Sequence, residues 1–467
     1  MTALPPKSSP ERKMLWILLV AAILRLWAIL VFHPPLFSDS KEYHDIAQSV
    51  VQGQGFSVDG KPTAFRLPAY PLLLAATYSI FGDSSVPIAL VQLMADLVSC
   101  LLIFAIGRKL ISERTGIVAA WILALFPIQI LYVPHLMTET LFTTIFLATL
   151  WLTLQDDLPL RKSVAIGVLV GIGILLRSTA LILPPMIAVY RWKVGDGAKR
   201  VLGSLAMVGV MAFLVVSPWL VRNVRQFERL SLTSNGGINF WMGSHAGATG
   251  SYSYPNGNPL MAVQDEFERS DLGVKLGVEF IISHPFEYSK VVAKKFVRFF
   301  SPDYWLMMTI EYKPEWAFAP NASTVFSQFS AVDVFLLHLP YVAVLFMGIF
   351  GLVCGASGNE RAEFIFRLLV LSWLLFHLLI IADARFRFPI MPIYFLSAAY
   401  CLETLRAGTL RRSPIRLAAA TAICLILAGG WLGEYVVIRT KAVPVAIGVP
   451  SFFDPHQFSP LLGKLQT

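Results

Sequence analysis

The feature that most constrains this chain is a series of long apolar runs with few charged residues, the first of which extends from residue 14 to residue 32. A helix of about 20 apolar residues crosses the roughly 30 Å of hydrocarbon in a bilayer. Composition agrees, because 56% of the residues are hydrophobic and only 14% are charged, whereas soluble domains carry about 25% charged residues. Within lipid, a helix satisfies its own backbone hydrogen bonds. The sequence therefore predicts an all-α polytopic membrane protein.

We expect about eleven transmembrane helices from these runs. They are expected near residues 14–32, 86–107, 115–133, 138–155, 163–176, 179–190, 201–221, 331–354, 363–382, 388–405 and 417–437. If the N-terminus is cytoplasmic, lysine and arginine gather in the loops on the cytoplasmic side, as the positive-inside rule requires. These loops account for the net charge of +9, so the charge gives no reason to expect a nucleic-acid partner.

The predicted organisation has three parts. Residues 1–221 are expected to form an N-terminal transmembrane module with a first outer loop at 33–85. Residues 222–330 are expected to form a modest periplasmic or extracellular region. Residues 331–467 are expected to form a C-terminal transmembrane module with a short outer tail. The apolar segment 67–81 is short for a span, so we expect it to lie in the membrane interface. The basic residues before the first run resemble a secretory signal without a cleavage site, which indicates an uncleaved anchor in the cell membrane.

Two or three carboxylates in the expected first outer loop could share one helix face, and one of them is a catalytic candidate. Asp39, Glu42 and Asp45 follow the first span at near-helical intervals, which can place them on one face at the outer membrane surface. A partly desolvated carboxylate there can act as a base. Alternatively, Asp39 only caps a short helix, with Glu42 completing a capping-box pattern. Glu139, at the outer mouth of the fourth expected span, is a second candidate because ionisable residues at that depth are usually functional.

Arginine side chains accumulate at the same outer side, against the bias that places cations in the cytoplasm. They come from sequence-distant segments and are Arg66, Arg177, Arg222, Arg385 and Arg387, with Lys61 close to Arg66. A guanidinium binds phosphate through its planar fork, so one phosphate site would explain all of them. Isolated anchors to lipid headgroups are the alternative.

Other polar residues within the spans favour structural roles. Arg25 and Asp96 lie inside the first two spans, where an interhelical ion pair is expected. His338 and His377 are expected to be packing residues, since no spacing suggests a metal cage. The four cysteines form no CxxC pair, so they indicate neither a zinc site nor a disulfide framework. A divalent metal is neither excluded nor indicated, and no other cofactor is expected.

Several short motifs, in this order and on this side of the membrane, resemble the GT-C membrane glycosyltransferases. They are SDSKEYHDIA at 38–47, RLPAYPL at 66–72, TE at 138–139, LRST at 176–179, PWLVRN at 218–223, NGGINFWMG at 235–243 and RFRFP at 385–389. The resemblance covers roughly residues 25–392 and is to the protein O-mannosyltransferase-like branch, which includes bacterial lipid A aminoarabinose transferases.

This resemblance implies a catalytic acid in the first outer loop, matched by Asp39, and a second acidic residue, matched by Glu139. The acid deprotonates or orients an acceptor that attacks the anomeric carbon of a polyprenyl-phosphate-linked sugar, with inversion. The resemblance implies phosphate contacts from arginines, for which Arg66, Arg177, Arg222 and Arg387 are the candidates. Supporting roles are expected for Glu42, Tyr43, Lys61, Tyr70 and Arg385. Many relatives carry an acidic pair where this chain has Asp39 and Ser40, which leaves the acceptor open among protein, lipid A and glycan.

Two other classes of membrane protein compete with this interpretation. A lipid or glycan transporter would show broken helices in an internal repeat, with charges near the middle of the membrane. No repeat is visible here, and the polar candidates cluster at one face. A lipid-linked glycan polymerase or ligase would also be polytopic with outer arginines. The sequence favours a glycosyltransferase whose partners are the polyprenyl-phosphate donor, membrane lipid and the acceptor.

Overall fold

The computed structural model describes residues 10–255, 257–310, 329–355, 359–408 and 413–440. The expected outer tail at 454–467 lies outside these ranges. The described chain is almost entirely helical, which confirms the all-α prediction. Its two short strands, β1 (Ser57–Val58) and β2 (Lys61–Pro62), form an antiparallel hairpin. Asp59 and Gly60 turn this hairpin with φ of 50° and 72°, as the two-residue turns of hairpins require.

Seven helical segments in the described part are long and apolar enough to span a membrane, so the chain is a multi-pass membrane protein. They are α1 (Pro10–Val31), α4 (Val86–Leu110), α10 (Ala198–Phe227), α16 (Ala331–Cys354), α17 (Glu360–Leu379), η4 (Ala384–Ile390) continuing into α18 (Met391–Arg406), and α19 (Pro414–Thr440).

The remaining apolar runs form shorter helices, so the expected number of eleven spans is not confirmed. They are α5 (Glu113–Leu125), α6 (Pro127–Tyr132), α7 (Glu139–Thr153), α8 (Leu160–Leu176), η1 (Ser178–Ile182) and α9 (Leu183–Lys193). The expected helix at 115–133 is interrupted at Phe126, because the residue before a proline is disfavoured in the α conformation. The segment expected in the interface is also a short helix, α3 (Ala69–Phe81), of 13 residues.

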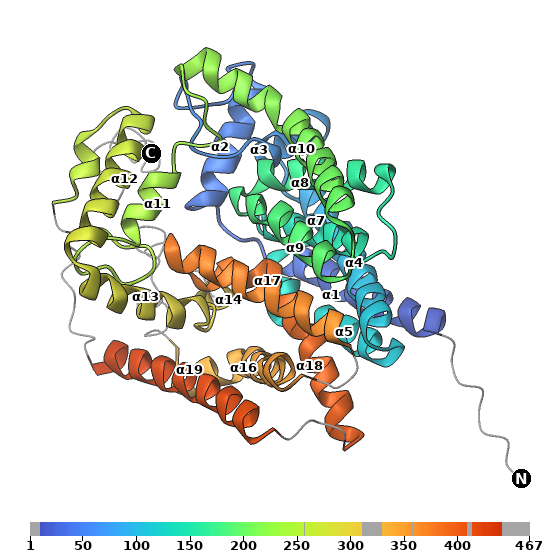
Figure 1. The fold of residues 1–467 in the computed structure, drawn as a ribbon. Coiled ribbons are helices and arrows are strands. Elements are labelled where there is room, and N and C mark those ends of the chain that lie inside the picture. Colours follow the sequence, from blue (N-terminus) through green and yellow to red (C-terminus); the bar gives the residue numbers. More distant parts are fainter. Residues whose placement is uncertain (1–9, 256, 311–328, 356–358, 409–412, 441–467) are drawn as a thin grey trace, which may run out of the picture. The chain divides into compact units, whose positions relative to one another are not determined.

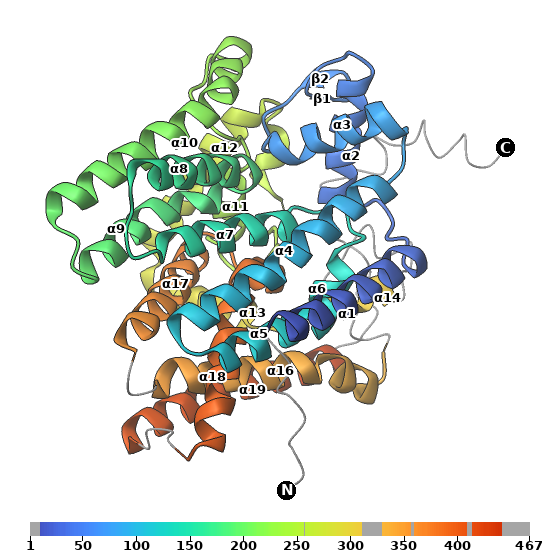
Figure 2. The same ribbon diagram turned by 90° about the vertical axis from the view of Figure 1, so that its right-hand side faces the viewer.

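The chain divides into two compact units. The first takes in the described residues of Met1–Thr233, Pro340–Phe376 and Arg387–Cys424. In it, α4 contacts α1, α5 and α7, while α8 packs along α10 (Figure 2). Residues 33–85, which we expected to form the first outer loop, contribute α2 (Asp39–Val51), the hairpin and α3, which are grouped near the beginning of α4 (Figure 2).

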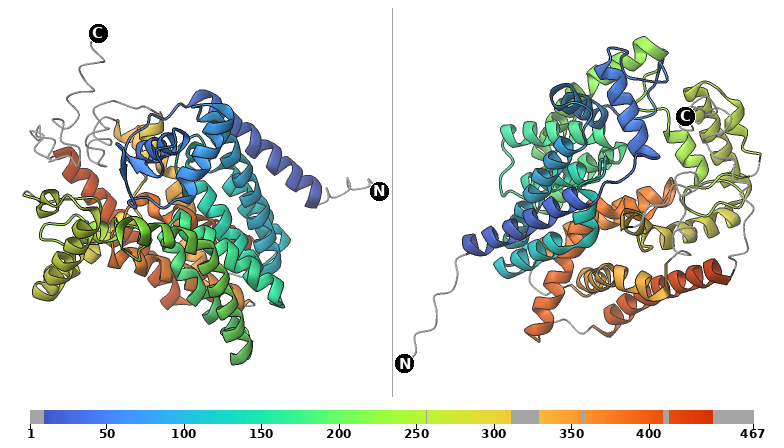
Figure 3. Two further views of the ribbon diagram at one scale, coloured as in Figure 1. Left: turned by 90° about the horizontal axis from the view of Figure 1, so that it is seen from above. Right: turned by 180° about the vertical axis from the view of Figure 1, so that it is seen from behind.

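The second unit takes in the described residues of Ser234–Leu339, His377–Phe386 and Leu425–Thr467. Its helices include α11 (Gly236–Met242), η2 (Pro259–Ala262), α12 (Glu266–Ser283), α13 (Pro285–Phe299) and α14 (Tyr304–Ile310). Helices α11, α12 and α13 lie side by side (Figures 1 and 3). Most of the expected outer region 222–330 therefore belongs to one compact unit.

A buried ion pair joins three helices of the first unit. Arg25 of α1 is fully buried, and its Nε lies 2.6 Å from Asp96 Oδ2 of α4. The same guanidinium donates to the carbonyl of Leu123, at 3.0 Å, and to that of Ala124, both near the C-terminal end of α5. A cation is favourable there because carbonyls without helical partners carry partial negative charge. The interhelical pair expected from the sequence is therefore present.

Glycines of α8 allow it to approach α10 closely. A Cβ at Gly167 would lie 2.5 Å from Met211 Cβ and 2.8 Å from the Val208 carbonyl oxygen. A Cβ at Gly171 would lie 2.7 Å from Val215 Cβ. Small residues at four-residue spacing are a common means of close helix packing in membranes.

We expect Gly167→Ala to reduce the free energy of unfolding by about 1–3 kcal/mol, because the two helices must separate to admit the methyl group. Gly209→Ala on α10 is the matched control, since its Cβ would meet open space. The control should be neutral or slightly stabilising through helix propensity. The measurement is the unfolding of each variant in detergent micelles. Equal stability of the two variants would contradict close packing at Gly167.

Candidate active site

Two carboxylates lie in the first turn of α2, directly after the first long apolar helix. Asp39 begins α2 and Glu42 follows within the same turn. Ser38, which precedes them, has φ of 50°, an unfavourable value for a residue other than glycine. The Ser40 hydroxyl accepts from the Phe37 backbone N–H at 3.1 Å and donates to the Phe37 carbonyl at 2.8 Å. These two hydrogen bonds fix the backbone where the chain enters α2. Backbone strain of this kind is concentrated at functional sites.

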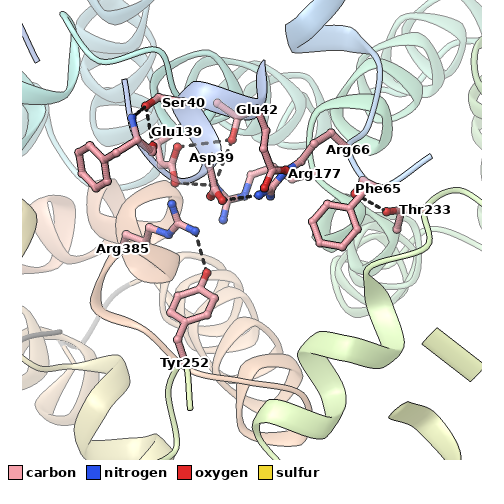
Figure 4. Close-up of polar contacts among 12 residues, drawn as sticks. Asp39, Ser40, Glu42, Phe65, Arg66, Glu139, Arg177, Thr233, Tyr252 and Arg385 are labelled. Carbon is pink, nitrogen blue, oxygen red and sulfur yellow. Dashed lines mark hydrogen bonds and ion pairs between the residues drawn. The ribbon is translucent and has the colours of Figure 1, made fainter. Parts of the chain in front are cut away.

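Arg66 joins both carboxylates. Its Nη2 donates to Asp39 Oδ1 and its Nε donates to Glu42 Oε2, each at 2.6 Å (Figure 4). Burial lowers the pKa of Arg66, but the neighbouring Asp39 and Glu42 carboxylates outweigh it and raise the pKa well above its ordinary value. Burial also raises the pKa of Glu42, although Arg66 opposes this. Glu42 is therefore easier to protonate than an ordinary glutamate.

Glu139 and Arg177 form a second ion pair in the same unit. Glu139 begins α7 and is almost fully buried, whereas Arg177 directly follows the end of α8. Arg177 Nη1 lies 2.8 Å from Glu139 Oε1 and 3.2 Å from the Thr138 hydroxyl. The N-terminal end of a helix favours a carboxylate.

Tyr43 and Tyr70 pack together beside the Arg66 ion pairs. Their rings meet edge to face with centroids 5.1 Å apart, and Arg66 lies over the Tyr43 ring at 5.5 Å. Burial, opposed by Arg66, raises the pKa of Tyr43 to about 12, and both Asp39 and Glu139 also contribute. The Tyr43 hydroxyl therefore lies within electrostatic reach of both carboxylates and stays protonated at neutral pH.

Gln92, which the sequence reasoning did not single out, fixes the position of Tyr70. It accepts from the Tyr70 hydroxyl at 3.0 Å, and its amide donates to the carbonyls of Val133 and His135 at 2.7 and 2.8 Å. The segment 33–85 is thereby tied to the turn before α7. Burial, partly opposed by Glu139, lowers the pKa of His135 to about 4, so this imidazole is neutral at pH 7. The sequence did hold a signal for Gln92, because it is a polar residue inside the apolar run 86–107.

The other basic residues predicted for the site are Arg222, Lys61, Arg387 and Arg385, and each has surroundings of its own. Arg222 donates to the carbonyls of Thr63 at 2.8 Å and Phe56 at 3.0 Å, so it holds the segment 33–85 against α10. Lys61 is exposed on the hairpin and makes no hydrogen bond or ion pair with the described residues. Arg387 belongs to the first unit, where it lies 4.2 Å from the Tyr341 ring centroid. Arg385 belongs to the second unit.

No group of three or more His, Cys, Asp or Glu side chains in the described ranges is placed to hold a metal ion. The four cysteines are free and buried. Both ring nitrogens of His338 lie near backbone carbonyls, those of Val334 at 2.7 Å and Asp303 at 3.1 Å. His377 packs between the rings of Phe299 and Phe386. These contacts agree with packing roles for the two histidines.

The second unit contains a buried lysine that was not predicted from the sequence. Lys295 of α13 is fully buried, and its Nζ donates to the carbonyls of Ile380 at 2.9 Å and Leu379 at 3.3 Å. Burial lowers the pKa of this amine from 10.5 to about 7. The sequence offered no clear signal, because Lys294 and Arg298 make this stretch look like the solvated face of an amphipathic helix.

This lysine predicts a pH dependence of stability. Between pH 7 and 10.5 the unfolded chain holds a proton on Lys295 that the folded chain has lost. The free energy of unfolding should therefore rise with pH across this window, by an amount on the order of a few kcal/mol. Unfolding titrations of the wild type and of Lys295→Met test this, since the variant should lack that part of the rise. Parallel pH profiles would contradict a lowered pKa.

The arrangement in the first unit can both accept a proton and bind an anion. Asp39 and Glu42 are carboxylates in the first turn of α2, where one of them can act as a base. Arg66 uses Nε and Nη2 for these carboxylates, and its Nη1 has no protein acceptor among the described residues. That nitrogen remains available for an anionic ligand.

Residues 61–221 match the family model described as dolichyl-phosphate-mannose-protein mannosyltransferase. The match confirms, over those residues, the resemblance inferred from the sequence motifs. It includes Arg66, Glu139 and Arg177 but neither Asp39 nor Glu42. A comparison with curated protein sequences finds no match.

Solved structures with a similar chain course include ArnT and an archaeal oligosaccharyltransferase. ArnT from Cupriavidus metallidurans bound to undecaprenyl phosphate is 14% identical, with a TM-score of 0.43, and the match covers 84% of this chain and 77% of that one. The apo oligosaccharyltransferase from Archaeoglobus fulgidus is 13% identical, with a TM-score of 0.48, and the match covers 91% of this chain and 56% of that one. This chain therefore spans about half the length of that oligosaccharyltransferase.

Proposed function

We propose that this protein is a membrane glycosyltransferase that moves a sugar from a polyprenyl-phosphate donor to an acceptor, with inversion at the anomeric carbon. The observation that carries the proposal is the cluster of Asp39, Glu42 and Arg66, which belongs to the same compact unit as the ion pair of Glu139 and Arg177. The matched family model supports the same chemistry, because its description names a dolichyl-phosphate sugar and a transferase.

In the proposed reaction Asp39 is the base. An acceptor hydroxyl or amine gives its proton to the Asp39 carboxylate while its oxygen or nitrogen forms a bond to the anomeric carbon. The bond from that carbon to the phosphate oxygen breaks, and polyprenyl phosphate leaves with the bonding electrons. Attack opposite to the leaving group inverts the anomeric carbon. Arg66 lies beside this base and can stabilise the negative charge that develops on the phosphate.

Glu42 has a distinct part in this proposal. As an anion it accepts from Arg66 Nε, and it shares the guanidinium with Asp39. Because its pKa is raised, Glu42 can become protonated when an anionic phosphate approaches. Protonation weakens its bond to Arg66, so that Nε can turn to the phosphate. Glu139 holds Arg177 in place as a second cation, and we propose donor contacts for Arg177, Arg222 and Arg387 as well.

We place this site at the outer face of the cell membrane, with the N-terminus in the cytoplasm. The positive-inside distribution of lysine and arginine supports this orientation. Membrane lipid surrounds the bundle, and the acceptor is a protein, lipid A or another glycan.

Mass spectrometry of glycans and glycolipids from cells with and without the gene tests the proposal. We expect one glycosylated product to disappear and its polyprenyl-phosphate donor to accumulate. The purified protein should then release polyprenyl phosphate from that donor when the acceptor is supplied. Movement of the lipid-linked sugar across vesicle membranes without cleavage of its sugar–phosphate bond would overturn the proposal in favour of transport.

A further inference from the structure

Gln92 is a fully buried glutamine within α4, one of the long apolar helices. A polar side chain at such a depth is costly unless its hydrogen bonds are made. The amide oxygen accepts from the Tyr70 hydroxyl at 3.0 Å, and the amide nitrogen, which has two protons, donates to two backbone carbonyls. None of these partners belongs to α4. Gln92 therefore joins other parts of the first unit to one another.

The two carbonyls belong to the turn at residues 133–138, which connects α6 to α7. They are those of Val133, at 2.7 Å, and His135, at 2.8 Å, and both residues are buried. No regular helix runs through this turn, so its buried carbonyls need donors from elsewhere. Gln92 supplies two of these donors. The position of the turn therefore depends on a side chain of α4.

Tyr70 approaches the same turn from α3. Its side chain is fully buried, and its hydroxyl donates to Gln92. Burial raises the pKa of Tyr70 well above its ordinary value, and nearby tyrosines and Glu139 add to this rise, whereas the Met137 backbone N–H opposes it. The hydroxyl thus stays protonated at neutral pH and lies close to the turn. We call Gln92 and Tyr70 the brace.

The turn leads directly to the two side chains that bind Arg177. Thr138 is the last residue of the turn, and Glu139 begins α7 with a side chain that is almost fully buried. Arg177 Nη1 lies 2.8 Å from Glu139 Oε1 and 3.2 Å from the Thr138 hydroxyl. A displacement of the turn would move both partners of this guanidinium. All of these residues belong to the first unit.

We propose that Gln92 is a positioning residue for sugar transfer, which acts with Tyr70 by holding the turn at 133–138 and so fixing Glu139 and its partner Arg177. This inference rests on the proposed function. Gln92 contacts neither donor nor acceptor in it. A reactive site keeps its geometry only when residues behind it lock the side chains that meet the substrate. A buried polar network does this when every member has its partners.

Gln92→Met tests the positioning role, because methionine is of similar length but makes none of the three hydrogen bonds. In the proposed function Arg177 contacts the donor, whereas the base Asp39 lies on α2. We therefore expect the KM for the polyprenyl-phosphate donor to rise about tenfold, with kcat changed less than about twofold.

Ser99→Ala is the matched control for Gln92→Met. Ser99 is also a buried polar residue of α4, and its hydroxyl shares a hydrogen bond with that of Thr144 within α7, at 2.9 Å. The control should keep the wild-type KM because it leaves the turn intact. An unchanged KM in Gln92→Met, or an equal rise in Ser99→Ala, would overturn the role.

The double variant Gln92→Met/Glu139→Gln tests whether Gln92 acts through Glu139. If it does, the double variant should have the same KM as Glu139→Gln alone, because the side chain that Gln92 positions has already been changed. A KM raised by the product of the two single effects would show that Gln92 acts elsewhere, and would overturn the proposal.

Hydrogen–deuterium exchange of residues 133–139 tests the brace without donor or activity. Gln92→Met and Tyr70→Phe should each speed exchange in this segment at least severalfold, while Ser99→Ala should leave it unchanged. Wild-type exchange rates in both brace variants would overturn the brace even if the enzyme is a glycosyltransferase. If the wild type transfers no sugar and binds no polyprenyl phosphate, the proposed function fails and so does the role of Gln92 in transfer. The exchange result still decides whether the brace holds the turn.

Discussion

Replacing Asp39 with asparagine is expected to lower sugar transfer by about 10²–10⁴-fold, the usual contribution of a general base. The amide cannot take the acceptor's proton, yet it has nearly the same size as the carboxylate. Its oxygen can still accept from Arg66 Nη2, which lies 2.6 Å from Asp39 Oδ1 in the wild type. Membrane insertion and donor binding should therefore be largely retained. The measurement is turnover of purified protein with a defined polyprenyl-phosphate sugar, alongside donor affinity.

Asp45→Asn is the matched control for this experiment. Asp45 lies on the same helix, α2, and pairs with Lys41 at 2.5 Å, but both side chains are substantially exposed. Such surface pairs contribute about 0–1 kcal/mol, so the control should keep wild-type turnover. Near-normal turnover in Asp39→Asn would remove Asp39 from the mechanism. Loss of activity in both variants would point to disruption of α2 instead.

The sequence predicted the helices and the residue types of the site better than the contacts among them. Apolar runs mark helices because burial in lipid and backbone hydrogen bonding act locally. The pairing of Arg66 with Asp39 and Glu42 depends on how the hairpin and α2 meet. No local sequence pattern predicts how the hairpin and α2 come together. The sequence predicted phosphate contacts for these arginines, which stay a prediction, but it did not indicate that Arg66 and Arg177 pair with carboxylates.

The two arginines of the RFRFP motif show a second feature that could not be predicted from the sequence. Arg385 and Arg387 are two residues apart in one motif, from which we expected a phosphate contact for Arg387 and a supporting role for Arg385. In the structure they belong to different compact units, and Arg385 contacts Tyr252 from a loop more than a hundred residues earlier. Lys295 was missed for the same reason, because its burial depends on where the end of α17 lies. Contacts between residues so far apart in the sequence depend on how the helices and loops pack, and the periodicity of apolar residues does not predict that packing.

Arg25→Met should be among the most destabilising single substitutions in the chain, at about 3–5 kcal/mol. It leaves the Asp96 carboxylate buried without its partner at 2.6 Å and removes the donors to the Leu123 and Ala124 carbonyls. Asp96→Leu should cost a similar amount, because it leaves the Arg25 guanidinium buried in an apolar bundle. Unfolding of each variant in detergent micelles, followed by tryptophan fluorescence, measures these losses.

The double variant Arg25→Met/Asp96→Leu separates the ion pair from the burial of charge. With neither charge present, the variant should be more stable than either single variant, because no uncompensated charge remains buried. It should not fully regain wild-type stability, since the α5 carbonyls still lack the donors that Arg25 supplied. The same cycle on exposed Lys41 and Asp45 should give a coupling of less than about 1 kcal/mol. Additive losses at Arg25 and Asp96 would show that the two charges do not depend on each other, and that the contact between α1 and α4 rests on apolar packing alone.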